Sequence, residues 1–355
     1  MVEAWIRGKP VTLDAAIAEA ADLMAASRLP VIAGLGTDVA GARAAIMLAQ
    51  RLRGVIDHMH SEILLRDLDV MREGGVMVIT PTEARLRADL LLLIGPGLIE
   101  AWPELPKKLL DGRRVICLCP DSAAKNAVAK LSASFVGDSA SELPVLLSVL
   151  RARCAARPVA DAPVAMASVD AVVAELNKAR FGVAVWSAAH HNSLTIEMLC
   201  GLVNDLNVGT RFSGLPLAAG DNAAAVQQVA GWVTGFPLRT GFGRGFAEHD
   251  IWRFDAARLI DSGEADCALW ISAYSSRTPT WKRKLPFIVL AADSGMQHAD
   301  VVITVGRPGI DHDAVEHLPA TATLTATTAN KPGGAPSVKT VLGRISAALP
   351  ATQLC

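Results

Sequence analysis

The sequence lacks the short motifs that mark the most common enzyme classes. Its 355 residues contain no GxSxG elbow, no GxxxxGK[ST] loop and no HExxH helix. These are the signatures of serine hydrolases, P-loop NTPases and zinc peptidases. No CxxC pair is present, and the six cysteines are scattered, so neither structural zinc nor an iron–sulfur cluster is indicated. Cys117 and Cys119 are predicted to share one face of a strand as buried core thiols.

The chain is also poor in aromatic and charged residues. Aromatic residues make up 5% of the chain with a single tyrosine, and charged residues make up 19%. The apolar 51% is mostly alanine, valine and leucine, which is typical of α/β proteins with alanine-rich helices. The 34 basic residues balance the 35 acidic ones, so the charge gives no indication of binding to nucleic acid or an anionic membrane. An interface between protein subunits is more compatible with this composition.

Long hydrophobic runs are missing. The most apolar run, Leu90 to Ile94, is far shorter than the roughly 20 residues of a membrane helix. The first residues include Glu3, Arg7 and Lys9 and have no apolar core of a secretory signal. We therefore expect a cytoplasmic protein.

What is present is an alternation of apolar strands with helical patterns. Near-continuous apolar strands joined by helices indicate Rossmann-like α/β domains, whose parallel sheets are covered on both faces. The Ala- and Pro-rich residues 156–168 predict a boundary between a domain at 1–155 and a second at 169–355, with interleaving left open. Strands are expected at Val31–Gly34, Val55–Ile56, Val76–Thr80, Ala88–Gly95, Arg114–Leu118, Val183–Ser187, Ala268–Ser272, Phe287–Ala291 and Val301–Val305. Helices are expected at Asp14–Ser27, Ala40–Leu52, Pro103–Leu110, Ser193–Asp205, Asn222–Gly231 and Ser337–Leu349.

The stretch Leu29 to Ala42, LPVIAGLGTDVAGA, predicts a strand, a glycine loop and a helix capped by Asp38. This is the place where α/β enzymes usually hold a cofactor, yet the loop has no Cys, Ser, His or Lys. Gly34 and Gly36 with Asp57 further on invite a dinucleotide interpretation. Val39 stands at the third glycine position, where a branched side chain disturbs close packing, so a tight packing turn is favoured.

Six of the eight histidines occur in three small groups. Asp57-His58-Met59-His60 has the HxH spacing that begins a zinc amidohydrolase site, but the following strands end without a histidine, which favours a solvated or interface pair. His190-His191-Asn192 and Asp311-His312-Asp313 with His317 are interpreted as polar loops and helix caps.

Trp232 to Asp250 is glycine-rich and aromatic without periodicity, and an irregular segment of that length is usually functional or an interface. Its Arg239 and Arg244 are candidates for binding an anion, because the planar guanidinium matches phosphate and carboxylate. Anchoring of the loop to a partner subunit is an equal alternative.

With these features placed, the chain resembles the B subunit of formylmethanofuran dehydrogenase, a molybdopterin or tungstopterin oxidoreductase. The resemblance implies the fold of that class, here without its N-terminal iron–sulfur domain. The stretches that carry it are Leu29–Ala42, Thr82–Asp89 continuing through LLLLIGPGLIEAWP, Thr234–Pro237 with Phe242–Gly245, and Ala265–Trp270.

The departures from that family are informative. The family has N-terminal cysteines for a [4Fe–4S] cluster, whereas this chain has none before Cys117. The family's loop cysteine, which ligates molybdenum or tungsten, corresponds here to Val39, and an isopropyl group cannot ligate a metal. The resemblance thus implies that metal, pterin and cluster are lost and that no catalytic or metal-binding residue remains. A vestigial cleft is expected at Gly34, Gly36, Thr37, Val39, Gly95, Arg239 and Arg244.

This pattern is similar to the beta subunit of the formyltransferase/hydrolase complex of methylotrophic bacteria, which serves one-carbon metabolism in formaldehyde oxidation. That complex converts formyl-tetrahydromethanopterin to formate through a methanofuran-type carrier. The resemblance implies a non-catalytic structural subunit whose partners are an amidohydrolase-like subunit, a formyltransferase subunit and a further structural subunit.

Two other interpretations stay open. The chain could be an active dehydrogenase subunit that binds a pterin cofactor through backbone contacts and a non-cysteine ligand. Alternatively, Ala15 to Ala42 is similar to the nucleotide-binding middle domain of thiamine-diphosphate enzymes. Gly220-Asp221-Asn222 is the nearest approach to the GDG motif of those enzymes, and it lacks the second glycine.

Overall fold

The protein was analysed as a computed structural model, which describes residues 3–75, 77–131, 133–160, 162–293, 295 and 298–350. It is an α/β protein with two compact units. Unit 1 comprises Met1–Leu65, Gly220–His317 and Leu324–Cys355, and unit 2 comprises Arg66–Ala219 and Leu318–Thr323. Unit 1 is therefore assembled from segments far apart in the sequence.

This division differs from the one expected at residues 156–168. That segment lies inside unit 2, between α7 (Leu143–Cys154) and α8 (Met166–Asn177), which pack in one apolar cluster. The reason is strand pairing, because β8 (Gly182–Ser187) runs parallel to β5 (Leu90–Ile94) in the same sheet. The prolines of the segment mark a connection between helices, where a break in helical structure is equally needed.

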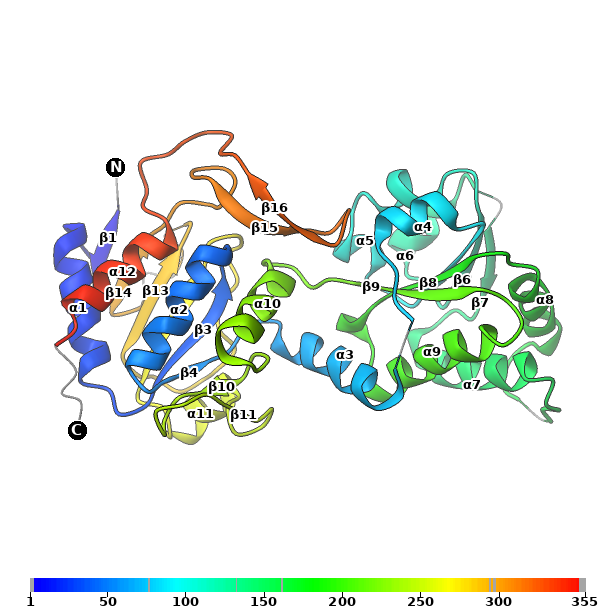
Figure 1. The fold of residues 1–355 in the computed structure, drawn as a ribbon, viewed down its shortest axis with the longest axis horizontal. Helices are drawn as coiled ribbons and strands as arrows, with labels where there is room; N and C mark the ends of the chain where they lie inside the picture. The colour runs from blue at the N-terminus through cyan, green and yellow to red at the C-terminus, as the bar shows by residue number, and fades with distance from the viewer. Residues whose placement is uncertain are drawn as a thin grey trace. The chain divides into compact units, whose positions relative to one another are not determined.

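Unit 1 is built on a nine-stranded sheet with the order β11-β10-β4-β3-β12-β13-β14-β1-β2 (Figure 1). Its central strands are parallel, and antiparallel pairs extend both edges. The strands are β1 (Ala4–Ile6), β2 (Lys9–Val11), β3 (Pro30–Gly36), β4 (Val55–Ile56), β10 (Thr240–Gly241), β11 (Glu248–His249), β12 (Cys267–Ser272), β13 (Phe287–Ala291) and β14 (Val301–Thr304).

Helices cover both faces of this sheet. Because side chains alternate along a strand, Ile32 of β3 packs in the cluster of the four helices α1, α2, α10 and α12, whereas Val31 and Ala33 pack in the cluster of α11. The helices are α1 (Leu13–Ala25), α2 (Val39–Arg51), α10 (Ala223–Thr234), α11 (Ala256–Ser262) and α12 (Val338–Ala348). The pair β15 (Ala314–Leu318) and β16 (Thr323–Thr327) forms a separate small sheet.

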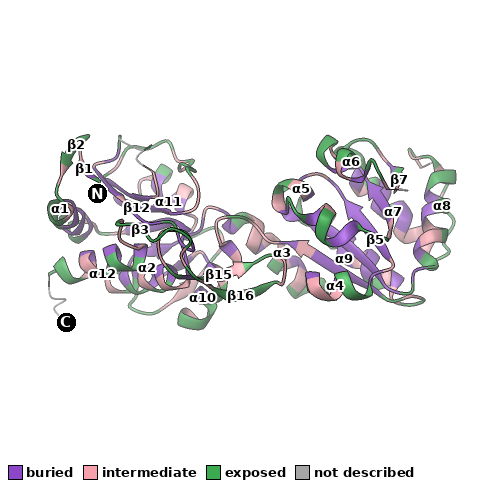
Figure 2. Ribbon diagram, turned by 90° about the horizontal axis from the view of Figure 1, so that it is seen from above, coloured by how far each residue is buried: buried purple, intermediate pink, exposed green. Residues whose placement is uncertain are grey.

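Unit 2 has a fully parallel five-stranded sheet with the order β7-β6-β5-β8-β9. Four of its strands are mostly buried, whereas β7 at the edge of the sheet is largely exposed, and its helices expose their outer faces (Figure 2). Beyond β5, β8, α7 and α8, its strands are β6 (Arg114–Leu118), β7 (Ala133–Val136) and β9 (Phe212–Leu217). Its other helices are α4 (Pro81–Arg87), α5 (Leu98–Ala101), the π-helix η1 (Pro106–Leu110), α6 (Ser122–Val128), η2 (Ala140–Glu142), η3 (Ala188–His190) and α9 (Ser193–Leu206). Helix α3 (Ser61–Gly74) begins in unit 1 and ends in unit 2.

Two local predictions are wrong. Residues 77–80 form no strand beyond a single bridge of Val78 to Gly214, because Thr80 already caps α4; Val76 lies outside the described residues. Cys117 and Cys119 pack in different clusters, on opposite faces of the sheet. Cys119 follows the end of β6 with a φ of +47°, which turns its side chain away from the strand alternation. Among the described residues, no helix is long and apolar enough to cross a membrane.

Candidate functional site

The glycine loop at the end of β3 is held by contacts with its own chain. As predicted, Asp38 caps α2, and its Oδ1 accepts a hydrogen bond from the Gly41 amide at 2.9 Å. Gly34 has a φ of +78°, and a Cβ added there would lie 2.6 Å from the carbonyl oxygen of Ile271 in β12. A glycine is needed at this position because of the left-handed backbone and the close approach of the neighbouring strand.

The other residues of this loop also make internal contacts. A Cβ at Gly36 would lie 3.1 Å from Cε of Met59. Thr37 is fully buried, and its carbonyl accepts a hydrogen bond from Nδ2 of Asn222 at 2.8 Å. Val39 is the first residue of α2 and packs against the apolar cluster of that helix. The loop therefore offers an apolar side chain where a metal ligand is expected.

The described cysteines do not supply that missing ligand. Burial raises the pKa of all five: to about 12 for Cys117 and Cys267 and to about 11 for Cys119, Cys154 and Cys200. Four of them lie in unit 2, and Cys267 of β12 is paired with Pro30, at the end of β3 that lies away from the loop. The described cysteines therefore do not fit a thiolate-bound molybdenum or tungsten centre at this loop or an iron–sulfur cluster.

A cavity of about 300 Å³ opens beside this loop within unit 1. It is bordered by β3, by the segment that follows β4, by β12 and by the connection between β12 and β13. Its lining residues are Ala33, Gly34, Asp57, His58, Met59, Glu62, Arg239, Asp255, Ala256, Ala257, Trp270, Arg277, Thr278, Thr280 and Trp281.

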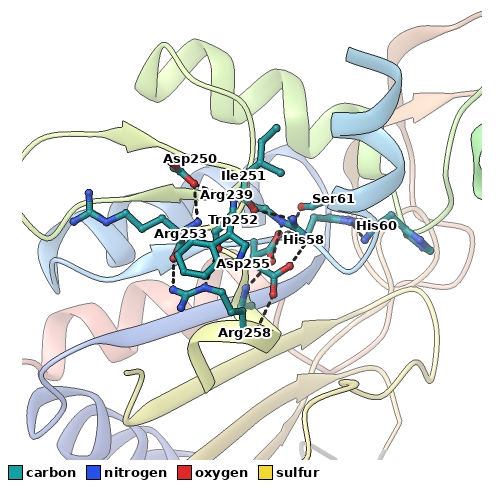
Figure 3. Close-up of polar contacts among 12 residues, drawn as sticks. His58, His60, Ser61, Arg239, Asp250, Ile251, Trp252, Arg253, Asp255 and Arg258 are labelled. Carbon is teal, nitrogen blue, oxygen red and sulfur yellow. Dashed lines mark hydrogen bonds and ion pairs between the residues drawn. The ribbon is translucent and has the colours of Figure 1, made fainter. Parts of the chain in front are cut away.

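Arg239 lies at this cavity, and its charge is engaged by carboxylates of the same chain. Its Nη2 lies 2.6 Å from Oδ2 of Asp255, and its Nε lies 3.6 Å from Oδ2 of Asp57. Its Nη1 donates a 2.8 Å hydrogen bond to the Ile251 carbonyl (Figure 3). The Arg239 side chain is only 12% exposed. It therefore ties the irregular segment to the sheet and has little charge left for an external anion.

Asp57 is the most unusual acid of the cavity. Burial raises its pKa from 3.8 to about 6, although Arg239 acts in the opposite direction. Its Oδ2 accepts a 2.9 Å hydrogen bond from the Ala256 amide, whereas its Oδ1 has no hydrogen-bond partner. Asp57 thus connects the start of α11 to the end of β4, a structural use of the carboxylate that the dinucleotide interpretation would place at a ribose.

Arg244 lies on the surface of the same segment. It forms a two-point ion pair with Glu248, with Nε 2.9 Å from Oε2, and its guanidinium lies 5.0 Å from the centre of the Phe246 ring. The two arginines proposed for anion binding therefore differ sharply in their surroundings: Arg239 is buried and Arg244 is exposed.

The histidine pair is buried, so the expectation of a solvated or interface pair is wrong. His58 Nδ1 accepts a hydrogen bond from the His60 amide at 3.0 Å, and its Nε2 donates to the Asp221 carbonyl at 3.2 Å. His60 Nε2 lies 2.9 Å from the Asp221 carboxylate, which Arg277 also approaches at 3.5 Å. Both rings thus bind a residue more than 160 positions away in the sequence.

No metal site results from this arrangement. Within the part of the chain that the structure describes, no three His, Cys, Asp or Glu side chains are placed to hold a metal ion. Burial and the neighbouring His60 lower the pKa of His58 from 6.5 to about 3. Burial acts to raise the pKa of Asp221, but the hydrogen bond from His60 keeps it below its ordinary value. His58, His60 and Asp221 thus form a buried polar network within unit 1.

The His58→Gln variant should be less sensitive to acid than the wild type. Because the pKa of His58 is lower in the folded state, its stabilising contribution is complete above pH 6.5 and is lost as the pH falls toward 3. The loss amounts to about 1.4 kcal/mol per pH unit. Denaturant unfolding followed by tryptophan fluorescence from pH 7 to pH 5 measures the difference between variant and wild type.

Asp57→Asn should change the pH dependence in the opposite sense. The folded-state pKa of Asp57 is raised, so its contribution is complete below pH 3.8 and is lost as the pH rises toward 6. Without the Asp57 carboxyl, nothing offsets the stability that His58 loses as the pH falls, so the variant becomes more acid-sensitive. Parallel pH profiles for both variants and the wild type would contradict this account of the two groups.

Other residues considered from the sequence lie elsewhere or serve the fold. Gly95 lies in unit 2, where a Cβ would lie 2.3 Å from the buried His191 ring, whereas the remaining candidates lie in unit 1. Asn192 caps α9 through the Thr195 amide at 2.9 Å, as interpreted. Asn222 of the GDN sequence donates to the Thr37 carbonyl and accepts from the His317 amide, so both its nitrogen and its oxygen bond the backbone of the protein.

The lining of the cavity also includes residues that no motif marks. Asp255, Trp270, Arg277 and Trp281 come from segments with no recognised chemical spacing. Arg277 and Trp281 lie in the long polar connection between β12 and β13. This connection could have been recognised from the sequence, because irregular segments at the carboxyl ends of parallel strands form the ligand sites of α/β folds.

Comparison with known proteins gives a consistent result. No protein-family model matches the sequence. The chain is 36% identical to the Fhc B subunit of the formyltransferase/hydrolase complex of Methylorubrum extorquens, over 86% of this chain and 85% of that relative. It is 27% identical to the B subunit of the tungsten-containing formylmethanofuran dehydrogenase 2 of Methanocaldococcus jannaschii, over 85% of this chain and 75% of that relative.

A solved structure agrees with these matches. A chain of the X-ray structure of the formyltransferase/hydrolase complex FhcABCD from Methylorubrum extorquens, in complex with methylofuran, matches with a TM-score of 0.86 and 32% sequence identity. The match covers 97% of this chain and 98% of that one.

Proposed function

Because this chain belongs to the family of the Fhc B subunit of the formyltransferase/hydrolase complex, we propose that it is a structural subunit of such a complex and has no catalytic site of its own. The observation that carries this proposal is Val39. It stands at the start of α2, where the metal-ligating cysteine of the formylmethanofuran dehydrogenase B subunit is expected, and it is partly buried against the core. A side chain without a donor atom cannot hold the metal.

The reaction of the complex then takes place on the other subunits. We infer that the complex converts formyl-tetrahydromethanopterin to formate through a methanofuran-type carrier. Its partners in this proposal are an amidohydrolase-like subunit, a formyltransferase subunit and a further structural subunit. The likeness to a chain of the FhcABCD complex over almost the whole length supports this assignment.

The fold of the chain is, in this proposal, that of molybdopterin oxidoreductases used without their redox chemistry. The two parallel-sheet units and the 27% identity to a tungsten-containing relative support this relation. The position beside the former metal ligand is taken by protein contacts: Gly34 against β12, Thr37 bonded by Asn222, and the histidine pair bonded by Asp221. These contacts support the proposal that pterin and metal are lost.

Affinity purification of the native chain tests the proposal. The tagged protein should retain the other subunits in fixed ratio and should contain only traces of molybdenum and tungsten by elemental analysis. Recovery of a lone monomeric chain would contradict the structural role. Stoichiometric molybdenum or tungsten would establish the active dehydrogenase instead, and a higher melting temperature with ADP, FAD or NAD would establish a nucleotide-binding protein.

A further inference from the structure

Exposed aromatic side chains are concentrated in one short segment of unit 1. Among the described residues, four of the five exposed aromatic side chains lie between positions 232 and 252. Trp232 is 65% exposed and Trp252 is 71% exposed. For a chain with so few aromatic residues, this concentration is not an effect of composition. We propose that the aromatic surface formed by Trp232, Phe236, Arg244, Phe246, Trp252 and Arg253 is the face on which another subunit of the complex docks.

This docking surface presupposes the structural role proposed above and locates it on unit 1. The segment runs from the end of α10 through β10 and β11 to the start of α11, in one region of unit 1 (Figure 1).

The backbone beneath these rings is firmly anchored. Leu238, Thr240 and Phe242 are buried, and β10 pairs with β4 at the edge of the main sheet. Arg239 adds its two ion pairs and its hydrogen bond to Ile251. A loop fixed in this way exposes its rings in a defined arrangement, which lowers the entropy lost on binding.

The exposed rings are themselves held in place by neighbouring side chains. Phe236 stacks on His249 with centroids 6.4 Å apart, and Trp252 lies 4.2 Å from the guanidinium of Arg258 (Figure 3). Phe246 lies beside Arg244, as described above. Tryptophan and arginine are the residue types that contribute most binding energy at protein interfaces, and ordered rings lose less entropy on immobilisation.

Two glycines of this segment have open space around them. Gly231, in the last turn of α10, and Gly243 both lack the left-handed backbone that favours glycine, and a Cβ at either would meet nothing within 4 Å. Glycine inside a helix costs about 0.5–1 kcal/mol relative to alanine. The open space beside them leaves room for a partner to approach the backbone closely.

The charges of this surface favour a protein partner over a phosphate-bearing one. Arg244 and Arg253 are balanced by Glu248, which lies between them, and by Asp250. Nucleic acids and anionic membranes are bound by surfaces with excess positive charge, which is missing here. The partner we expect is a folded subunit with apolar recesses for the rings and little net charge opposite the balanced groups Arg244, Arg253 and Glu248.

The test compares two double variants of the full chain in the native complex. Trp232→Ser with Phe246→Ser removes two exposed rings of the aromatic surface. Among the described ring contacts, Phe246 has one, with Arg244, and Trp232 has none. Phe135→Ser with Leu194→Ser removes two exposed apolar side chains from unit 2 and is the matched control. We expect the first pair to lower the recovery of co-purifying subunits at least about 30-fold and the control to leave it unchanged.

The outcomes are distinguishable from those for the proposed function. If the wild-type chain recovers no subunits, the structural role itself fails. If the wild type recovers them and the surface variant does so equally well, only the docking surface is wrong. Self-association of the wild type that the surface variant abolishes, or flotation of the wild type with vesicles of anionic lipid, would also overturn it. Equal melting temperatures of the two double variants establish that a loss of subunits is not misfolding.

Discussion

Replacing Arg239 with alanine should destabilise unit 1 by about 3–5 kcal/mol, the cost typical of removing one partner from a buried ion pair. The reason is that Asp255 loses a partner at 2.6 Å and that Asp57, already poor in partners, loses the neighbouring positive charge. The Ile251 carbonyl also loses its hydrogen bond from the guanidinium. Denaturant unfolding of the purified chain at pH 7 measures the change in free energy.

Arg244→Ala is the matched control, because it removes the same side chain a few residues further along. Its guanidinium is exposed and pairs with Glu248 on the surface, so the change should cost no more than about 1 kcal/mol. Equal and small effects at the two positions would contradict the structural role assigned to Arg239. They would reopen the possibility that its charge serves a bound anion.

Gly34→Ala should be the most damaging single change in the glycine loop, with a loss of about 3 kcal/mol or more. A left-handed backbone disfavours any side chain, and the added Cβ would lie 2.6 Å from a backbone carbonyl that cannot move without disturbing β12. Thermal denaturation of the purified variant measures the loss, and poor yield of soluble protein would have the same origin.

Gly36→Ala, two residues further on, distinguishes a packing role of the glycine loop from a ligand-binding role. The nearest atom to its added Cβ is Cε of Met59 at 3.1 Å, the end of a flexible side chain that can shift. We expect a loss below about 1 kcal/mol, within the range of ordinary small-to-large changes. If both variants melt like the wild type and instead lose binding of an added nucleotide, the loop is a working cofactor site and the proposed role is wrong.

The strands of both sheets were accessible from the sequence because burial on two faces leaves near-continuous apolar runs. Val55–Ile56, Arg114–Leu118 and Phe287–Ala291 have the expected bounds. The strand expected at Val76–Thr80 failed because a short apolar run says nothing about whether a neighbouring strand is available. Strand β9 was missed because Gly214 and Pro216 interrupt its apolar pattern.

The candidate site shows the same limit. Val39 as a residue without a ligand atom was evident from the sequence alone. The burial of His58 and His60 was not, because it depends on Asp221 and Arg277, which are far away in the chain. The same holds for Arg239, whose carboxylate partners are Asp57 and Asp255.

The sequence by itself determined the α/β class, the capped glycine loop and the family of this protein, since these depend on residue types at short spacing. Only the tertiary structure decided how the chain divides into units and which polar side chains are satisfied inside it. Residues 156–168 join two helices of one unit because β8 pairs with β5, a contact between strands almost a hundred residues apart. Long-range pairing of this kind sets burial, and burial decides whether a histidine or an arginine is free to act or serves to hold the fold together.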